Sequence, residues 1–235
     1  MDVYGLLAVS IGAVAVLWLG RKGLRALEAA NQADWGSRWL NRLDGLTRIF
    51  CRRFHRFEHD PVPLNGDGPA LLVSNHVSGL DPMLIVAACR RPVRFIIAEE
   101  QYRRFGLTWL FRAIGCIPVD RSGAASRAYR AALSALAAGE VVALFPHGRI
   151  HLDSDPPRPL KPGVARMAQL SGAPIYPVRI EGVRGEGHVV QAVLIRSHAR
   201  LRSFPPLQCR ELPIADCLER LREVLDARRE NVAVN

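Results

Sequence analysis

Short apolar runs alternate with longer amphipathic segments from about residue 70 onward. Short runs bounded by turn-forming residues are typical of buried strands, whereas apolar positions three or four residues apart are typical of helices. The predicted strands are residues 70–74, 93–98, 116–119, 141–145, 175–180 and 189–195. The predicted helices are residues 82–89, 106–114, 124–138, 163–170 and 215–229. Such alternation predicts an α/β fold with a mostly parallel sheet flanked by helices.

The N-terminal part of the chain has a different pattern. Residues 3–20 form an uncharged apolar run of 18 residues, which as a helix would be about 27 Å long, close to the hydrocarbon thickness of a bilayer. No basic segment precedes the run, as a signal peptide would require, and Arg21, Lys22 and Arg25 follow it. We therefore expect a membrane anchor that leaves the rest of the chain on the cytoplasmic side, with a buried core helix as the alternative.

A second N-terminal segment, residues 35–57, predicts a basic amphipathic helix. Its apolar positions are Trp35, Trp39, Leu43, Leu46, Phe50, Phe54 and Phe57. Its basic positions are Arg38, Arg42, Arg48, Arg52, Arg53 and Arg56. Such a helix can lie among lipid headgroups or pack its apolar stripe on the domain, and the pattern allows both. A linker rich in Pro, Gly and Asp follows, so we expect an N-terminal helical part at residues 1–59 and an α/β domain at residues 60–235.

The charge and the cysteines narrow the classes of partner. A net charge of +10 favours anionic partners such as an acidic membrane surface, a phosphorylated substrate or nucleic acid. Nucleic acid is not expected, because no zinc-finger spacing, RNA-binding signature or helix-turn-helix pattern is present. The five cysteines show no C-x-x-C spacing and predict reduced, structural thiols and no metal site.

Polar residues that can carry chemistry follow the predicted strands. His76, Arg121, Gly148 and Arg149 each come shortly after such a strand, and Lys161 precedes a predicted helix. In open α/β sheets, the loops beyond the carboxyl ends of the strands gather into one site. We therefore expect these side chains to share a site, in which Arg121, Arg149 and Lys161 bind a phosphate group.

His76 and Asp81 are the candidate catalytic pair. A neutral imidazole can accept a proton near pH 7, and a carboxylate can orient it. On one helix, residues five apart would point in different directions, but a strand–loop–helix corner with Gly79 as its flexible residue can bring them together. The alternative is that Asp81 only caps the following helix and His76 is a polar loop residue. No Gly-x-Ser-x-Gly elbow is present, so the reacting hydroxyl is expected to belong to the substrate, as in direct acyl transfer.

Four blocks of this sequence resemble, in order and spacing, those of the glycerolipid acyltransferases typified by bacterial 1-acylglycerol-3-phosphate acyltransferase. They are Asn75-His76-x4-Asp81, Gly115-Cys116-Ile117-Pro118-Val119-Asp120-Arg121, Phe145-Pro146-His147-Gly148-Arg149 and Ala173-Pro174-Ile175-Tyr176-Pro177-Val178. The resemblance implies that His76 and Asp81 are catalytic. It also implies substrate binding by the second and third blocks, including Arg121, Pro146, Gly148 and Arg149, and acyl-chain binding by the fourth.

The resemblance further implies a membrane enzyme that acylates a lysophospholipid, with lysophosphatidate as the leading acceptor. The donor would be acyl-CoA or acyl carrier protein, no cofactor would be bound, and the catalytic domain would face the cytoplasm at a bacterial inner membrane. One departure stands out: His147 occupies a position where the family usually has Glu, so the headgroup pocket is expected to be altered. Another lipid acceptor, a lipid hydrolase and a catalytically silent lipid-binding relative therefore remain alternatives.

Overall fold

A single sheet organises the part of the chain that the structure describes. The computed structural model describes residues 18–64, 66–120 and 125–226. Its strands are β1 (Glu58–His59), β2 (Ala70–Ser74), β3 (Val93–Ala98), β4 (Ile117–Val119), β5 (Val141–Leu144), β6 (Ile175–Glu181) and β7 (Arg200–Ser203). They are ordered β1-β7-β6-β2-β5-β3-β4, and every neighbouring pair is parallel except β6 and β7. The predicted α/β class with a mostly parallel sheet is confirmed.

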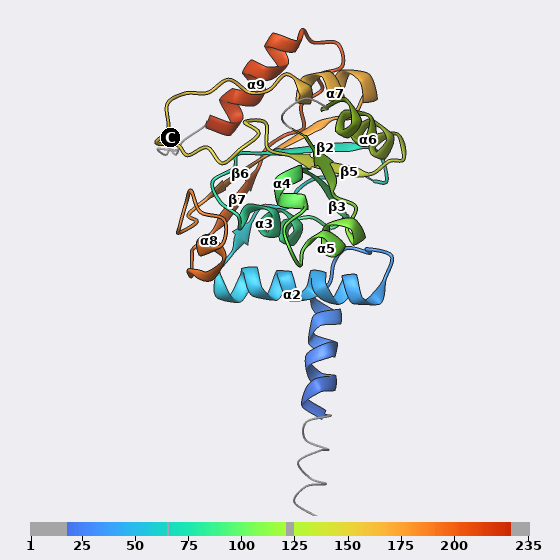
Figure 1. The fold of residues 1–235 in the computed structure, drawn as a ribbon, viewed down its shortest axis with the longest axis vertical. Coiled ribbons are helices and arrows are strands. Elements are labelled where there is room, and N and C mark those ends of the chain that lie inside the picture. The colour runs from blue at the N-terminus through green and yellow to red at the C-terminus, as the bar shows by residue number, and fades with distance from the viewer. Residues whose placement is uncertain (1–17, 65, 121–124, 227–235) are drawn as a thin grey trace, which may run out of the picture.

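Helices cover both faces of this sheet (Figure 1). They are α2 (Arg38–Phe54), α3 (Asp81–Ala88), α4 (Glu99–Tyr102), α5 (Thr108–Ala113), α6 (Ala125–Ala137), α7 (Gly163–Ser171), α8 (Gln191–Leu194) and α9 (Ile214–Asp226). Helices α6, α7 and α9 lie on one face, whereas α3 lies on the other and α2 crosses beyond it. In the central strand β2, Leu72 joins the core on the α3 side, and Leu71 and Val73 join the core on the α6 side. A strand buried on both faces explains why residues 70–74 are apolar without alternation.

One predicted strand is wrong. Residues 189–195 contain the short helix α8, and the strand that pairs antiparallel with β6 is β7, further along the chain. Gly182, Gly185 and Gly187 all have positive φ, so the chain leaves β6 through a tight loop and cannot continue as a strand. Strand β7 was missed because its sequence, Arg-Leu-Arg-Ser, contains a single apolar residue.

Helix α2 confirms the predicted helix over a shorter range, Arg38–Phe54 within residues 35–57, and its faces are arranged differently from the expected stripe. The side that meets the domain carries Leu40, Asp44, Arg48 and Cys51, all buried. Arg48 was expected on the basic surface and is 7% exposed, whereas Trp39, expected on the apolar stripe, is 44% exposed. The polar pair was missed because an (i, i+4) Asp–Arg spacing is also typical of a solvated helix face.

A second N-terminal helix, residues 18–30, projects from the domain across α2 (Figure 1). A Cβ at Gly45 of α2 would lie 1.9 Å from the carbonyl oxygen of Leu27, so the two helices cross in backbone contact. Within the described residues, no helix combines the length and apolar character needed to cross a bilayer. Residues 3–17 of the predicted anchor lie outside the described part of the chain, so the anchor remains a prediction.

The cysteine prediction is corrected at one pair. Cys209 and Cys217 form a disulfide, with their Cα atoms 5.6 Å apart, whereas Cys51, Cys89 and Cys116 are buried free thiols. The disulfide links the loop after β7 to the first part of α9. The two cysteines are eight residues apart, which is not a C-x-x-C spacing, so the pairing depends on how α9 packs.

Candidate active site

His76 and Asp81 meet at the corner between β2 and α3. The Nδ1 atom of His76 lies 2.8 Å from Oδ2 of Asp81, which also accepts the backbone N–H groups of Val77 (2.7 Å) and Ser78 (2.9 Å). The Ser78 hydroxyl donates to Oδ1 of Asp81 at 2.7 Å. Asp81 is the first residue of α3, whose N-cap is Leu80, so its carboxylate faces back over the loop and does not cap the helix. The predicted contact is present, and the capping alternative is wrong.

The imidazole of His76 is fixed by two contacts. Asp81 engages Nδ1, and the Phe145 ring stacks on the imidazole with centroids 3.9 Å apart and planes 14° apart. Because a fully buried carboxylate accepts at Nδ1, the neutral ring carries its proton there and leaves Nε2 as an acceptor. The His76 side chain keeps 18% of its surface exposed and lines a cavity. This arrangement can take a proton from a substrate hydroxyl.

The loop between the two residues is held by a segment far along the chain. The N–H of Gly79 donates to the carbonyl of His188 (3.2 Å), and the N–H of Gly187 donates to that of Val77 (2.8 Å). A Cβ at Gly79 would lie 2.2 Å from the carbonyl oxygen of Val189. Gly79 is therefore needed for close approach of this segment, and its φ is not positive, unlike the flexible turn expected from the sequence.

A cavity of about 1080 Å³ opens beside His76. Its walls include Phe95, Ile96 and Ile97 of β3, three consecutive residues. Since consecutive strand residues point to opposite faces, the cavity is lined from both sides of the sheet. Leu40 and Leu43 of α2 also line it, and most of its wall is apolar. Its volume slightly exceeds the roughly 300–1,000 Å³ usual for small-molecule sites.

The predicted substrate-binding residues divide into two groups. Pro146, Gly148 and Lys161 line the cavity together with His76, whereas Arg149 is exposed and does not. Arg121 lies outside the described residues. Gly148 has a φ of +74°, and a Cβ there would lie 2.6 Å from Nζ of Lys161. The glycine thus provides the space in which the Lys161 side chain lies along this loop.

His147 lies away from this cavity, contrary to the expectation that it reshapes a headgroup pocket. It is buried, its ring lies 4.4 Å from that of His151, and it is not among the residues lining the cavity. Its Nδ1 atom is buried without a hydrogen-bond partner in the described part of the chain. Burial lowers the pKa of His147, and the neighbouring His151 lowers it further. His147 is therefore a neutral buried side chain under the site.

This burial predicts a pH dependence of stability. Because the pKa of His147 is lower in the folded protein than its ordinary value of 6.5, the unfolded chain binds more protons below about pH 6.5. The melting temperature should therefore fall as the pH is lowered from 7 to 5, and it should fall less in His147→Leu. His55, whose pKa burial also lowers, should account for part of what remains. The measurement is thermal unfolding at several pH values, with His188→Leu, at an exposed histidine, as control. An equal fall in His147→Leu and the unsubstituted protein would contradict the prediction.

No group of three or more His, Cys, Asp or Glu side chains among the described residues could hold a metal ion. Among the polar residues that line the cavity, His76 can act as a base and the Lys161 ammonium can bind an anion. Their chemistry is proton transfer and electrostatic stabilisation of an anion.

Comparisons with known proteins show which family the chain resembles. A model of the acyltransferase family matches residues 52–181. A Mycoplasma genitalium protein named "Probable 1-acyl-sn-glycerol-3-phosphate acyltransferase" is 30% identical over 124 residues, which are 50% of this chain and 46% of that protein. N-acylphosphatidylethanolamine synthase of Arabidopsis thaliana is 30% identical over 120 residues, 47% of this chain and 42% of the synthase. The matches thus span less than half the length of these two relatives.

The fold also has a solved counterpart. The crystal structure of the 1-acyl-sn-glycerophosphate acyltransferase PlsC from Thermotoga maritima matches with a TM-score of 0.60 at 20% identity, covering 83% of this chain and 86% of that one. At this identity, the likeness concerns the fold alone. The family match, in contrast, spans more than half of the chain and encloses His76, Asp81 and the Gly148 loop. The chain belongs to the acyltransferase family.

Proposed function

We propose that this protein transfers a fatty acyl group from an acyl thioester, acyl-CoA or acyl carrier protein, to the hydroxyl of a lysophospholipid. Lysophosphatidate, which would give phosphatidate, is the acceptor we place first. The observation that carries the proposal is the His76–Asp81 pair, whose free imidazole nitrogen borders a large apolar cavity. The family match and the name of the Mycoplasma genitalium relative support the reaction class.

The first step is removal of a proton. Nε2 of His76 accepts the proton of the acceptor hydroxyl while the oxygen attacks the thioester carbonyl. Asp81 stabilises the imidazolium that forms and keeps its ring in place. The stacking of Phe145 restricts the remaining rotation of the ring, so the base is oriented before substrate binds.

The second step returns the proton. Attack gives a tetrahedral oxyanion, which collapses with cleavage of the carbon–sulfur bond and departure of the thiolate. The imidazolium of His76 gives its proton to that thiolate, so the enzyme ends in its starting state and no acyl-enzyme forms. The backbone N–H groups of Val77, Ser78 and Gly79 are all engaged in other hydrogen bonds. Oxyanion stabilisation is therefore assigned to donors other than these three N–H groups.

The cavity suits a lipid substrate. Its mostly apolar wall would hold a hydrocarbon chain, while Lys161 would bind an acceptor phosphate at its polar end. Arg121 and Arg149 stay in the proposal as phosphate-binding residues; Arg149, which is exposed and outside the cavity lining, would reach a headgroup that extends beyond the cavity. Pro146 and Gly148 would form the wall against which the acceptor lies.

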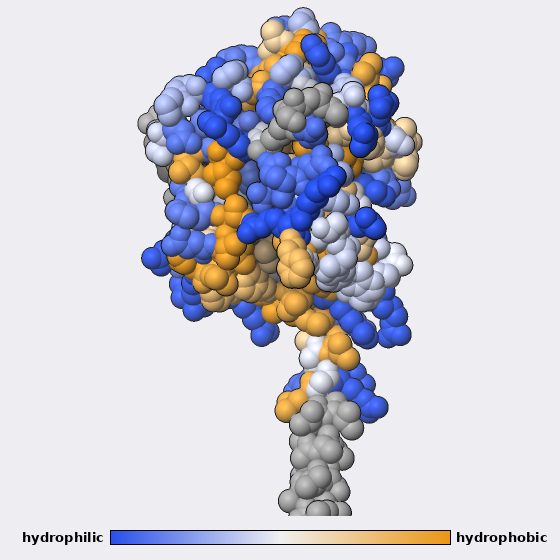
Figure 2. All heavy atoms as spheres, viewed as in Figure 1, coloured by the Kyte–Doolittle hydropathy of each residue, from blue (hydrophilic) through white to orange (hydrophobic). Residues whose placement is uncertain are grey.

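We further propose that the protein works at a membrane surface, with residues 3–20 as anchor and the catalytic domain on the cytoplasmic side. Large exposed apolar side chains support this, among them Trp39 and Leu46 on α2, Trp109 on α5 and Leu194 on α8. Figure 1 places these three helices at the end of the domain from which helix 18–30 projects, and Figure 2 shows apolar surface running toward that end. Contiguous exposed apolar surface is typical of sites that bind membranes or partners.

The test of the reaction is a labelled-thioester assay with purified full-length protein and detergent-dispersed lysophosphatidate. Acyl transfer that depends on the lysolipid is the expected result. Loss of thioester without transfer would indicate a hydrolase, and neither product would indicate a silent lipid-binding relative. Either result would overturn the proposed transfer.

A second acceptor class is favoured by one observation. The Arabidopsis thaliana relative is named for acylation of phosphatidylethanolamine, whose acceptor group is an amine. The same assay therefore includes phosphatidylethanolamine, and transfer to it with no transfer to lysophosphatidate would replace the hydroxyl acceptor by an amine. The His76 base would serve either reaction, because both acceptors must lose a proton on attack.

The membrane part of the proposal predicts an effect of truncation. Removing residues 1–20 should lower the fraction of protein that sediments with vesicles containing anionic lipid, because the longest apolar segment is lost. The truncated protein should keep the circular dichroism and melting temperature of the domain. Unchanged sedimentation would contradict the anchor role.

A further inference from the structure

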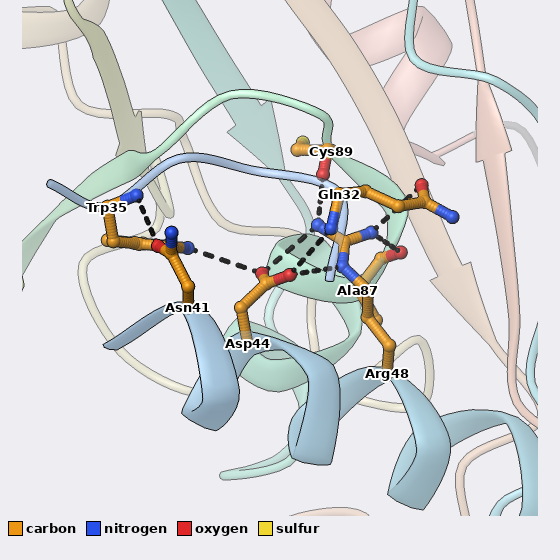
Figure 3. Close-up of polar contacts among 7 residues, drawn as sticks. All are labelled: Gln32, Trp35, Asn41, Asp44, Arg48, Ala87 and Cys89. Atoms are coloured by element: carbon orange, nitrogen blue, oxygen red, sulfur yellow. Dashed lines mark hydrogen bonds and ion pairs between the residues drawn. The ribbon is translucent and has the colours of Figure 1, made fainter. Parts of the chain in front are cut away.

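A buried polar network connects α2 to the end of α3 (Figure 3). The Arg48 guanidinium donates from Nε to Asp44 Oδ2 (2.6 Å) and from Nη2 to Asp44 Oδ1 (3.1 Å). Its other N–H groups donate to the carbonyls of Ala87 (2.8 Å) and Cys89 (2.5 Å) and to the side chain of Gln32 (3.2 Å). Arginine has five N–H donors, and all five are used.

The carboxylate of Asp44 is equally saturated. Beyond the two bonds from Arg48, it accepts the backbone N–H of Gln32 (3.1 Å) and the indole N–H of Trp35 (3.3 Å). Both Asp44 and Trp35 also line the large cavity, whereas Arg48 does not. Because Arg48 has no donor left and does not reach the cavity, it is not a phosphate-binding residue.

The carbonyls of Ala87 and Cys89 belong to the C-terminal end of α3, and both residues are buried. The last carbonyls of a helix have no hydrogen-bond partners within the helix, and they form the negative end of its dipole. A buried guanidinium supplies them with both N–H donors and a positive charge. Helix α3 has eight residues and is about 12 Å long, and its first residue is Asp81. Arg48 therefore binds the C-terminal end of α3, a short helix whose first residue carries the catalytic carboxylate.

Stability alone does not require charges here. Buried ion pairs can be replaced by apolar residues of similar size with little loss of stability, whereas well-paired buried charges can define how two elements sit against each other. Apart from the hydrogen bonds of Asp81 at its first residue, the remaining buried contacts of α3, such as those of Leu84 and Ile85, are apolar and permit small slides and rotations. The planar guanidinium of Arg48, whose N–H groups point in fixed directions, does not permit such slides and rotations.

We propose that Arg48 and Asp44 form a positioning pair that sets α3 relative to α2 and thereby aligns Asp81 with His76. The pair makes the placement of the catalytic carboxylate depend on the helix that borders the apolar cavity. This inference rests on the proposed acyl transfer for its kinetic readout, but its spectroscopic readout does not.

The test is the double variant Asp44→Leu/Arg48→Met, which removes both charges and leaves neither one unpaired. The matched control is Arg222→Met/Asp226→Leu, which removes an exposed (i, i+4) pair from α9. We expect the double variant to melt cooperatively but at a lower temperature, because the carbonyls of Ala87 and Cys89 and the N–H groups of Gln32 and Trp35 lose their partners. Its kcat should fall by roughly tenfold to a hundredfold, because the base is misaligned. KM for both substrates should change less than kcat, because of the two replaced residues only Asp44 lines the cavity. The control should keep its kcat.

The second readout follows the His76–Asp81 hydrogen bond directly. In protein labelled with ¹⁵N-histidine, the Nδ1–H signal of His76 is the one missing from His76→Ala. It should move or broaden in the double variant and stay in place in the control. An unmoved signal, or a kcat within about twofold of the unsubstituted protein, would overturn the proposal. If the double variant does not fold, Arg48→Lys takes its place, because lysine keeps the positive charge but lacks the planar set of N–H donors. The kcat and the Nδ1–H signal of His76 in that variant then test the proposal in the same way.

Failure of the proposed function gives a different pattern. If the unsubstituted protein transfers no acyl group, the proposed function is wrong, and there is no kcat with which to compare the variants. The Nδ1–H signal still reports whether Arg48 and Asp44 align the pair.

Discussion

Replacing His76 with alanine is expected to lower the kcat of acyl transfer by roughly a hundredfold to ten-thousandfold, the range typical of a lost general base. Nε2 of His76 is the imidazole nitrogen that Asp81 leaves free, and the ring borders the cavity. Without it, the acceptor hydroxyl must lose its proton to water in an apolar site. Substrate binding should change little, so KM for the thioester and for the lysolipid should stay within a few-fold.

The experiment needs a histidine that the mechanism does not use. His188→Ala is the control, because its exposed side chain bonds to the Glu186 carbonyl, and its own backbone carbonyl, which accepts from Gly79, is unchanged by the substitution. Circular dichroism and membrane sedimentation of both variants should match the unsubstituted protein. Near-normal transfer by His76→Ala, with folded protein in the assay, would end the general-base mechanism.

Much of this site could be predicted because it is local in the sequence. Strands at Ala70–Ser74 and Val93–Ala98 have the predicted bounds, since uninterrupted apolar runs between turn residues leave few alternatives. The His76–Asp81 contact could also be predicted, because the strand, the loop and the start of the helix that bring the two residues together are adjacent in the sequence. Local spacing was enough to bring the two groups together.

The features that were missed depend on segments far apart in the chain. Arg48 was read as a surface charge, because nothing in its own helix indicates that it meets the carbonyls of Ala87 and Cys89. His147 follows β5 among residues that do line the cavity, yet its ring turns toward His151. Which way a loop side chain turns depends on tertiary packing, and apolar periodicity carries no information about it.

The second large effect concerns the charge on Asp81. This buried carboxylate accepts three N–H groups at Oδ2, from His76, Val77 and Ser78, and the Ser78 hydroxyl at Oδ1. In Asp81→Asn, the amide oxygen can keep the three N–H bonds if the amide nitrogen faces Ser78, whose hydroxyl can accept as well as donate. The opposite amide orientation would set N–H against N–H at three places. The corner should therefore survive, and with it the proton on Nδ1 of His76.

What Asp81→Asn removes is the negative charge beside the imidazolium that forms as His76 takes the substrate proton. We expect kcat to fall by roughly a hundredfold to ten-thousandfold with little change in KM, since the lost interaction exists only once charge develops. Asp81→Ala should in addition lower the melting temperature, because it leaves two buried backbone N–H groups without acceptors, each costing about 1–3 kcal/mol. Ser78→Ala is the matched control, because it removes the two hydrogen bonds of the Ser78 hydroxyl, to Asp81 and from the Leu80 N–H, but no charge. Turnover of Asp81→Asn within about threefold of the unsubstituted protein would show that the carboxylate only shapes the loop.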